Sequence, residues 1–335
     1  MDLNTISFLL VGVLVVGYAI LDGFDLGVGM LSLFARSKEE RDLHVGAIGP
    51  VWDGNEVWLL AMGDLLFGAF PLVFTTVFSG FYLAFMLLLV ALVARAVAIE
   101  FRLLHPSSHW VRFWDWAFGL GSLGSTLLLG VAVGNVLRGV PIGPGFAWEG
   151  SFLGLLNPYA LLIGIVSCAL LLTHGALYLW TKTDGELSDR LSRMALYAYI
   201  AFLSLYGVTI AATLIVSPFL FRKAGSLVVL GFTVLLAAAL VSIPFMIRTG
   251  MKRAAFLASS ATIALIIIVV ALSVYPVLVP SSLNPELSLT IYNAASTQGT
   301  HRLMLGIALI GMPIMLGYTF AVYRVFRGPT RVGPY

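Results

Sequence analysis

The sequence predicts an all-α polytopic membrane protein. Hydrophobic residues make up 60% of the chain and charged residues only 10%, with a mean hydropathy of +1.00. A soluble protein carries about 25% charged residues, so this composition excludes an ordinary soluble domain. Nine stretches have about 18 or more mainly apolar residues, enough to cross a bilayer. The basic residues form no continuous stripe, which argues against a nucleic-acid partner.

The first stretch, 6–34, follows the segment MDLNTIS, which contains an acid and no basic residue. Because no small-residue cleavage site follows, we expect a retained transmembrane helix and not a signal peptide. The second stretch, 50–70, opens with Pro50, a residue suited to the first position of a helix. The stretches at 6–34 and 73–101 are long enough to tilt or to extend beyond the bilayer. The remaining stretches lie at 113–137, 156–180, 194–216, 225–247, 254–277 and 301–325.

An internal correspondence indicates how these helices group. Shifting the chain by 152 residues aligns Asp22 with His174 and Arg41 with Arg193. The first eight helices would then form two parallel four-helix bundles, and the ninth would be a peripheral helix. We therefore expect a first bundle, an external connection, a second bundle, a turn-rich external loop, and the peripheral helix with its tail. These parts lie at 1–137, 138–155, 156–277, 278–300 and 301–335.

Basic residues are unevenly distributed between the two sides of the predicted bundles. Fourteen Lys and Arg residues lie in the connections after the first, third, fifth and seventh helices and in the C-terminal tail. Only four lie on the opposite side, and Arg95 lies within the third helix. Because cytoplasmic loops carry an excess of Lys and Arg, we expect the N-terminus outside and the C-terminus in the cytoplasm.

Carboxylates gather at the predicted cytoplasmic end of the first bundle. Ionised groups are costly in hydrocarbon, and chains of buried carboxylates mark proton relays. One hypothesis is therefore a path for proton uptake. Asp64 lies on the same helix face as the first acid of the second helix, about 16 Å farther along. The five candidates for the path are Asp22, Asp25, Asp53, Glu56 and Glu100.

The same acids also have structural interpretations. The two acids of the second helix suit a helix N-terminus, where the macrodipole favours negative charge. Glu100 suits an ion pair with Arg95 or Arg102. The two acids of the first helix lie in the segment DGFDLG, which suits a turn whose carboxylates bind backbone.

The aromatic residues and histidines bear on cofactors. Trp52 and Trp58 flank the acids, and they suit either interface anchors or the lining of an apolar passage for a small neutral molecule. Only His174 lies within a predicted span, so no pair of buried histidines can ligate a haem. We expect His174 to pack or to form an interhelical hydrogen bond. Cys168 is the single cysteine, so neither an intrachain disulfide nor a cysteine metal motif can form.

Four segments carry distinctive motifs. They read YAILDGFDLGVGML (18–31), GPVWDGNEVWLL (49–60), LNPELSLTIYNAAS (283–296) and ALIGMPIMLGYTFAVYRVFRG (308–328). These segments resemble subunit II of the cytochrome bd-type quinol oxidases, and WDGNEVW is the most specific of them. The C-terminal segments resemble most closely the branch that includes cyanide-insensitive oxidases.

The resemblance implies a haem-free subunit of a terminal oxidase in a prokaryotic cytoplasmic membrane. In this family, subunit I carries two b-type haems, one haem d and the quinol-oxidising loop. The complex reduces dioxygen to water without pumping and takes its protons from the cytoplasm. By match, Asp53 belongs to a proton path and Trp58 lies beside an oxygen route. Where many relatives carry Gln, this chain has Glu56. Some members also hold a structural quinone in subunit II, and a small single-helix accessory subunit is a further expected partner.

Two other functions compete with this one. The buried acids and the internal correspondence also fit an ion-coupled secondary transporter, which should have broken helices at mid-membrane in both halves. The acids here lie in one half, which argues against a transporter. The third alternative is a purely structural membrane partner whose acids only fix helix packing.

Overall fold

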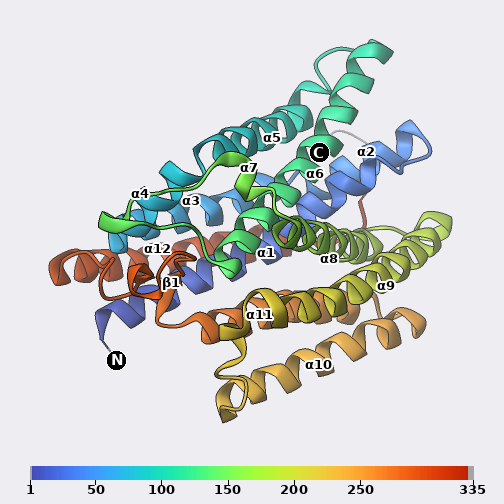
Figure 1. Ribbon diagram of the computed structural model, residues 1–335. Helices are drawn as coiled ribbons and strands as arrows, with labels where there is room; N and C mark the ends of the chain where they lie inside the picture. The colour runs from blue at the N-terminus through green and yellow to red at the C-terminus, as the bar shows by residue number, and fades with distance from the viewer. Residues whose placement is uncertain (1, 331–335) are drawn as a thin grey trace.

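Apolar helices of membrane length form most of the computed structural model, which describes residues 2–330 (Figure 1). Within this part of the chain, eight helices are long and apolar enough to span a bilayer, or nine if one bent pair counts as a single span. The eight are α1 (Leu3–Ser32), α5 (Tyr82–Phe101), α6 (Ser108–Arg138), α8 (Pro158–Lys182), α9 (Gly185–Val216), α10 (Leu227–Arg248), α11 (Lys252–Val274) and α12 (Gln298–Val325).

The bent pair replaces the second predicted span. Helices α3 (Trp52–Ala69) and α4 (Pro71–Gly80) meet at an angle of 118°. Phe70, between them, has φ −132° and ψ 63°, outside the helical range. Pro71 cannot continue α3, because its ring lacks an N–H group and clashes with the preceding turn. It is instead well placed at the first position of α4.

Two predicted boundaries are wrong in this region. The stretch at 73–101 is not one helix, because the backbone leaves helical geometry at Phe81 and the long helix α5 begins only at Tyr82. Helix α3 begins at Trp52, so Pro50 lies before it and not at its first position.

Helix α1 lies in the middle of the molecule and contacts both halves (Figure 1). It packs against α3 and α6 on one side and against α8 and α11 on the other, while α12 packs against α1 and α3. Helices α6 and α8 also pack against each other. The two predicted four-helix groups are therefore in direct contact, and the division of the chain into two bundles stays a prediction.

The crossing of α1 and α8 depends on glycine. A Cβ atom on Gly27 would overlap the carbonyl oxygen of Leu171, and one on Gly175 would overlap the backbone of Gly27. Small residues allow two helix backbones to approach closely where lipid gives no hydrophobic driving force. These glycines let the two halves of the chain pack together.

The connections that the sequence assigns to the cytoplasm meet at one end of the bundle. There α2 (Lys38–Ile48) docks on the second half, because Glu40 forms an ion pair with Arg190 of α9. Tyr178 of α8 also donates a hydrogen bond to the carbonyl of Ala47, at 2.9 Å. Which side of the membrane this end faces stays a prediction.

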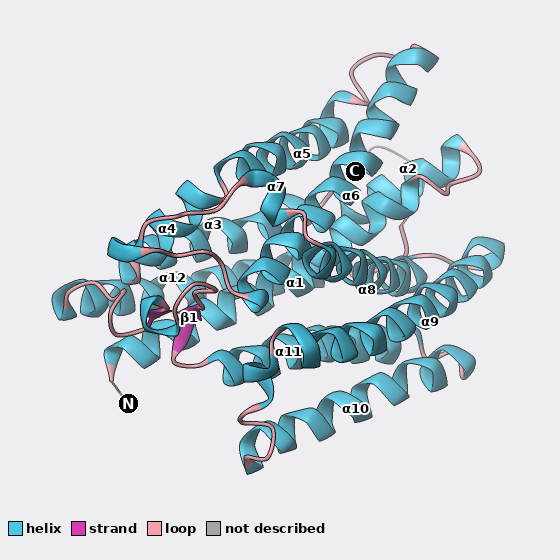
Figure 2. Ribbon diagram, in the orientation of Figure 1, coloured by secondary structure: helices cyan, strands magenta, loops and turns pink. Residues whose placement is uncertain are grey.

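The opposite end is covered by ordered loops, as the turn residues predict. Strand β1 (Val277–Val279), magenta in Figure 2, pairs antiparallel with β2 (Leu289–Thr290). Val140 forms an isolated bridge with Ser281. The sequence did not predict these short strands. The helical turns at this end are η1 (Pro144–Phe146), α7 (Phe152–Leu155), η2 (Pro218–Phe221) and η3 (Pro285–Leu287).

The glycine crossing gives a direct test. Gly27→Val should lower the stability of the protein by about 1–3 kcal/mol, because the added side chain overlaps the backbone of α8. The measurement is the thermal midpoint of the purified protein in detergent. Gly12→Val on the same helix is the control, since a Cβ there meets no atom of the described residues within 4 Å. Equal midpoints for the two variants would contradict this account of the crossing.

Candidate functional site

The buried Arg95 brings together acids from two neighbouring helices. Arg95 of α5 has no exposed surface, and its guanidinium lies among three carboxyl groups. Its Nη2 atom lies 2.6 Å from Oδ1 of Asp22 and 4.0 Å from Oδ2 of Asp25. Its Nη1 atom lies 3.1 Å from Oε1 of Glu56. These four residues are the Arg95 cluster, and they join α1, α3 and α5.

Helix periodicity explains how α1 supplies two of the acids. Asp22 and Asp25 are three residues apart on a continuous helix, so they project from one face toward α3 and α5. Both carboxyl groups are fully buried. The predicted turn at DGFDLG is wrong, because the whole segment is helical.

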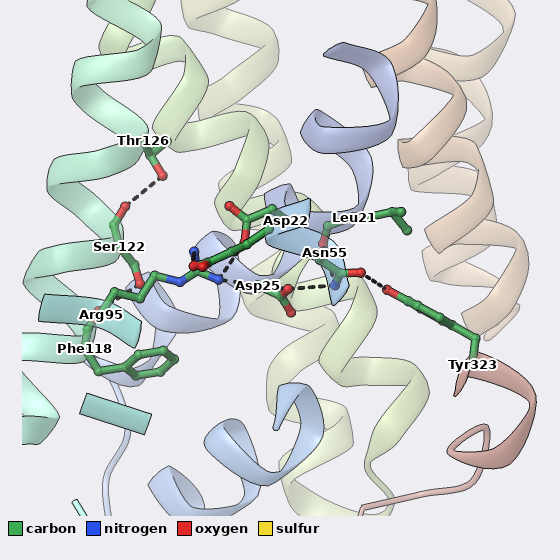
Figure 3. Close-up of polar contacts among 10 residues, drawn as sticks. Leu21, Asp22, Asp25, Asn55, Arg95, Phe118, Ser122, Thr126 and Tyr323 are labelled. Carbon is green, nitrogen blue, oxygen red and sulfur yellow. Dashed lines mark hydrogen bonds and ion pairs between the residues drawn. The ribbon is translucent and has the colours of Figure 1, made fainter. Parts of the chain in front are cut away.

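Two further polar side chains extend the cluster toward α12. Asn55 donates a hydrogen bond from Nδ2 to Oδ2 of Asp25, at 2.7 Å, and accepts one at Oδ1 from the hydroxyl of Tyr323, at 3.0 Å. Figure 3 shows this row, with Arg95 pointing toward the aspartates and Asn55 lying between Asp25 and Tyr323. The last transmembrane helix is therefore connected to the Arg95 cluster by hydrogen bonds.

Several buried polar atoms around the cluster have no hydrogen-bond partner among residues 2–330. Buried polar groups are normally satisfied by protein or by ordered water. A site that is this polar has the partners that a buried water molecule needs. The atoms are the hydroxyl of Tyr18, Oδ2 of Asp22, Oδ1 of Asp25 and Nε of Arg95.

The structure separates the five predicted acids. Asp22 and Asp25 are buried within the cluster, whereas Asp53 and Glu100 are exposed on the surface of this chain. Glu56 lies between these extremes, because its side chain is 28% exposed and also contacts Arg95. The three-residue spacing of Asp53 and Glu56 thus brings only one of them to the cluster.

The predicted ion pair of Glu100 is wrong. Arg95 is held by the acids of α1 and α3, and Arg102 lies 2.6 Å from both Asp42 and Asp115. Burial and charge decide this outcome, because both arginines turn toward the protein interior while Glu100 ends on the surface.

Trp58 is buried and not exposed at a membrane interface. Its ring lies against Gly17 of α1 so closely that a Cβ atom there would overlap it. It belongs to an apolar cluster with Leu14, Tyr18 and Leu65, while its Nε1 atom has no hydrogen-bond partner in the described part of the chain. An interfacial anchor is therefore wrong for Trp58, and the apolar surroundings agree with the alternative of an apolar lining.

The ring nitrogens of His174 are already hydrogen-bonded, so this histidine does not suit a haem ligand. His174 uses both ring nitrogens, with Nδ1 2.7 Å from Oγ of Ser259 and Nε2 3.0 Å from the carbonyl oxygen of Ile20. This confirms the predicted interhelical hydrogen bond and leaves no nitrogen free for iron. His44 is buried within α2 and does not lie in a loop, while His301 of α12 contacts Ser7. Among residues 2–330, no group of three or more His, Cys, Asp or Glu side chains could hold a metal ion.

The sequence identified the three acids of the Arg95 cluster but not the arginine that they share. Arg95 was placed within a span, but its role as the shared partner of the acids was not predicted. The signal in the sequence was the free-energy cost of an arginine inside a membrane helix, because such a residue requires buried acids as partners. No periodic pattern indicates Asn55, Tyr18 or Tyr323.

The fold and the cluster define an integral membrane protein of many helices with a charged core at the junction of α1, α3 and α5. The chain belongs to the family of cytochrome bd terminal oxidase subunit II, whose family model matches residues 3–326.

Relatives and a solved structure agree with this assignment. The chain is 38% identical to cytochrome bd-I ubiquinol oxidase subunit 2 of Escherichia coli, covering 96% of this chain and 93% of the relative. It is 33% identical to cytochrome bd ubiquinol oxidase subunit 2 of Bacillus subtilis, covering 97% and 96%. Its fold matches a chain in the structure of bd oxidase from Geobacillus thermodenitrificans with a TM-score of 0.81, at 19% identity and 97% and 99% coverage.

Removing the central cation should destabilise the fold. Arg95→Gln leaves three carboxyl groups around a site without positive charge, so we expect a loss of about 3–5 kcal/mol in stability. The measurement is the unfolding midpoint in detergent together with the yield of folded protein. Arg248→Gln, at an exposed arginine of α10, is the control and should change stability by less than about 0.5 kcal/mol. Similar effects of both substitutions would show that the cluster does not hold the helices together.

Proposed function

We propose that this chain is the haem-free subunit II of a quinol:dioxygen oxidoreductase, a terminal oxidase of aerobic respiration in a prokaryotic cytoplasmic membrane. Its role is to support proton uptake from the cytoplasm and oxygen access to the haems of subunit I, without proton pumping. Membership of the subunit II family carries this proposal. The similarity to two ubiquinol oxidase subunits supports the assignment to an oxidoreductase complex.

The two b-type haems and the haem d belong to subunit I in this proposal. The described histidines do not fit a haem, because both ring nitrogens of His174 are already hydrogen-bonded and His105 and His109 are exposed near the start of α6. No step of the chemistry is therefore assigned to an iron held by this chain. Its contribution is to supply protons and to shape the path of a small gas molecule.

Proton uptake is assigned to the acids at the start of α3. Asp53 lies on the surface in the first turn, and Glu56 connects that surface with the buried Arg95. Asp22 and Asp25 provide the negative charge that holds Arg95 in place. Three carboxyl groups share one guanidinium, so the cluster has more acids than it can neutralise and can hold an exchangeable proton. Glu100 is exposed and is not among the acids paired with Arg95, so its place in this path stays a prediction.

The exposed face of α3 is the proposed contact with subunit I. Side chains spaced by three and four residues form one exposed stripe on this helix. A carboxylate facing lipid is costly, so a partner protein must cover this stripe inside the membrane. Two acids and three apolar residues make up the stripe: Asp53, Val57, Leu60, Asp64 and Phe67.

The oxygen route is placed beside Trp58. The ring is surrounded by apolar side chains of α1 and α3, including Leu14 and Leu65. Dioxygen is small and apolar, so such surroundings favour it over water and ions.

One observation weighs against the transporter alternative. Such a protein needs interrupted helices in both halves. Between residues 2 and 330, the only strongly bent pair of membrane helices is α3–α4, in the first half. A measurement of oxygen uptake distinguishes the purely structural role from the oxidase role.

Asp53→Asn should slow the assembled oxidase without loss of its haems. Removing the carboxylate removes the proposed proton acceptor at the surface, so quinol-driven oxygen uptake should fall about tenfold or more. Asp53→Glu should restore most of the rate, and Asp64→Asn on the same exposed face is the matched control. Normal turnover of Asp53→Asn would favour the purely structural role.

The orientation can be tested by labelling. Ser282 is exposed in the loop at 278–300, and Arg253 is exposed at the opposite end of the bundle. In a Cys168→Ala background, Ser282→Cys should react with a membrane-impermeant maleimide on intact cells, because the excess of basic residues places the other end in the cytoplasm. Arg253→Cys should react only after the membrane is opened. The reverse pattern would invert the topology.

A further inference from the structure

We propose that the cavity between α1, α2 and α6 binds the phosphate headgroup of an anionic phospholipid. This inference goes beyond the proposed role in proton and oxygen delivery and does not depend on it. The cavity has a volume of about 590 Å³ and opens at the basic end of the bundle. Its lining residues are Ser32, Leu33, Lys38, Arg41, Pro106, Ser108, Val111, Arg112, Asp115 and Trp116.

The charge of this cavity is positive. Lys38, Arg41 and Arg112 line it together with one acid, Asp115. That acid is already bound, because Nε of Arg102 donates to its Oδ1 at 2.6 Å. Within residues 2–330, neither Lys38 nor Arg112 forms an ion pair. Arg41 does pair with Asp115, but this contact is long, at 3.9 Å. Two or three cationic groups are therefore available to one anion.

The start of α6 adds hydrogen-bond donors. Ser107 is the N-cap of this long helix, but its side chain accepts no hydrogen bond from the first turn. The free N–H groups of such a turn favour an anion. Ser108, in the same turn, lines the cavity. The helix end and the basic side chains thus favour the same ligand.

Apolar residues on the same cavity identify the anion as part of a lipid. Leu33, Val111 and Trp116 line it, and Trp116 is 54% exposed. The cavity lies where two membrane helices end, which is the depth of lipid headgroups, and indole rings prefer this depth. A free phosphate needs only the charges, whereas a phospholipid also uses the apolar side for its acyl chains. Anionic lipids are attracted to basic clusters at the cytoplasmic surface.

The experiment uses the intact oxidase complex, reconstituted in nanodiscs of phosphatidylcholine with a minor fraction of phosphatidylglycerol. Native mass spectrometry after detergent release measures how much phosphatidylglycerol remains bound. The double variant Lys38→Gln with Arg112→Gln should retain roughly tenfold less, because each basic residue near the headgroup adds several-fold preference. The double variant Arg193→Gln with Arg253→Gln is the control, since both residues are exposed and basic but lie outside the cavity.

Two outcomes would overturn the proposal. One is equal retention of phosphatidylglycerol by the cavity variant and the control variant. The other is complete displacement of the lipid by an excess of inorganic phosphate, which would identify a free-anion site. Charge reversal, Arg112→Glu, gives a second measurement and should abolish retention. The haem spectrum and the rate of oxygen uptake show that each variant has folded and assembled.

Discussion

The ion pair between Arg95 and Asp22 is the interaction on which the arrangement of the first helices depends. A guanidinium without any exposed surface cannot remain in an apolar helix unless acids from neighbouring helices surround it. Those acids come from α1 and α3, so the position of α5 relative to both is fixed by charge as well as by packing. Asn55 and Tyr323 then extend the same network to α12.

This arrangement gives the acids of the chain different tasks. The buried pair on α1 holds the guanidinium of Arg95, whereas Asp53 lies on the face that we assign to subunit I. Glu56 connects the two environments, because it is partly exposed and also contacts the guanidinium. In the proposed path, a proton taken up at Asp53 would thus pass to Glu56 at the edge of the Arg95 cluster, next to the face that we assign to subunit I.

Much of the fold follows from composition and periodicity, and the errors have local physical causes. Length and hydropathy identify the membrane helices, since a bilayer demands long apolar segments. They do not reveal the bend at Phe70, because Pro71 is as apolar as its surroundings and interrupts only the backbone. The position of His174 within an apolar segment correctly predicted its hydrogen bond to another helix.

The candidate site was predicted only in part. The acids were found because charge is rare in such a chain, but their partners depend on which faces of α1, α3 and α5 meet. A single sequence does not show how each helix is rotated about its own axis. Glu100 illustrates the limit, because it lies near two arginines in the sequence and yet both arginines bind acids from other helices. Asn55 and Tyr323 carry no charge and therefore leave no signal in hydropathy.

A double-mutant cycle between Arg95 and Asp22 tests the central claim most directly. The variants Arg95→Gln, Asp22→Asn and their combination would be compared by unfolding in detergent. The buried pair predicts a coupling free energy of about 2–3 kcal/mol, with the double variant more stable than the sum of the single losses implies. Additive losses, within about 0.5 kcal/mol, would contradict the claim that this ion pair holds the helices in place.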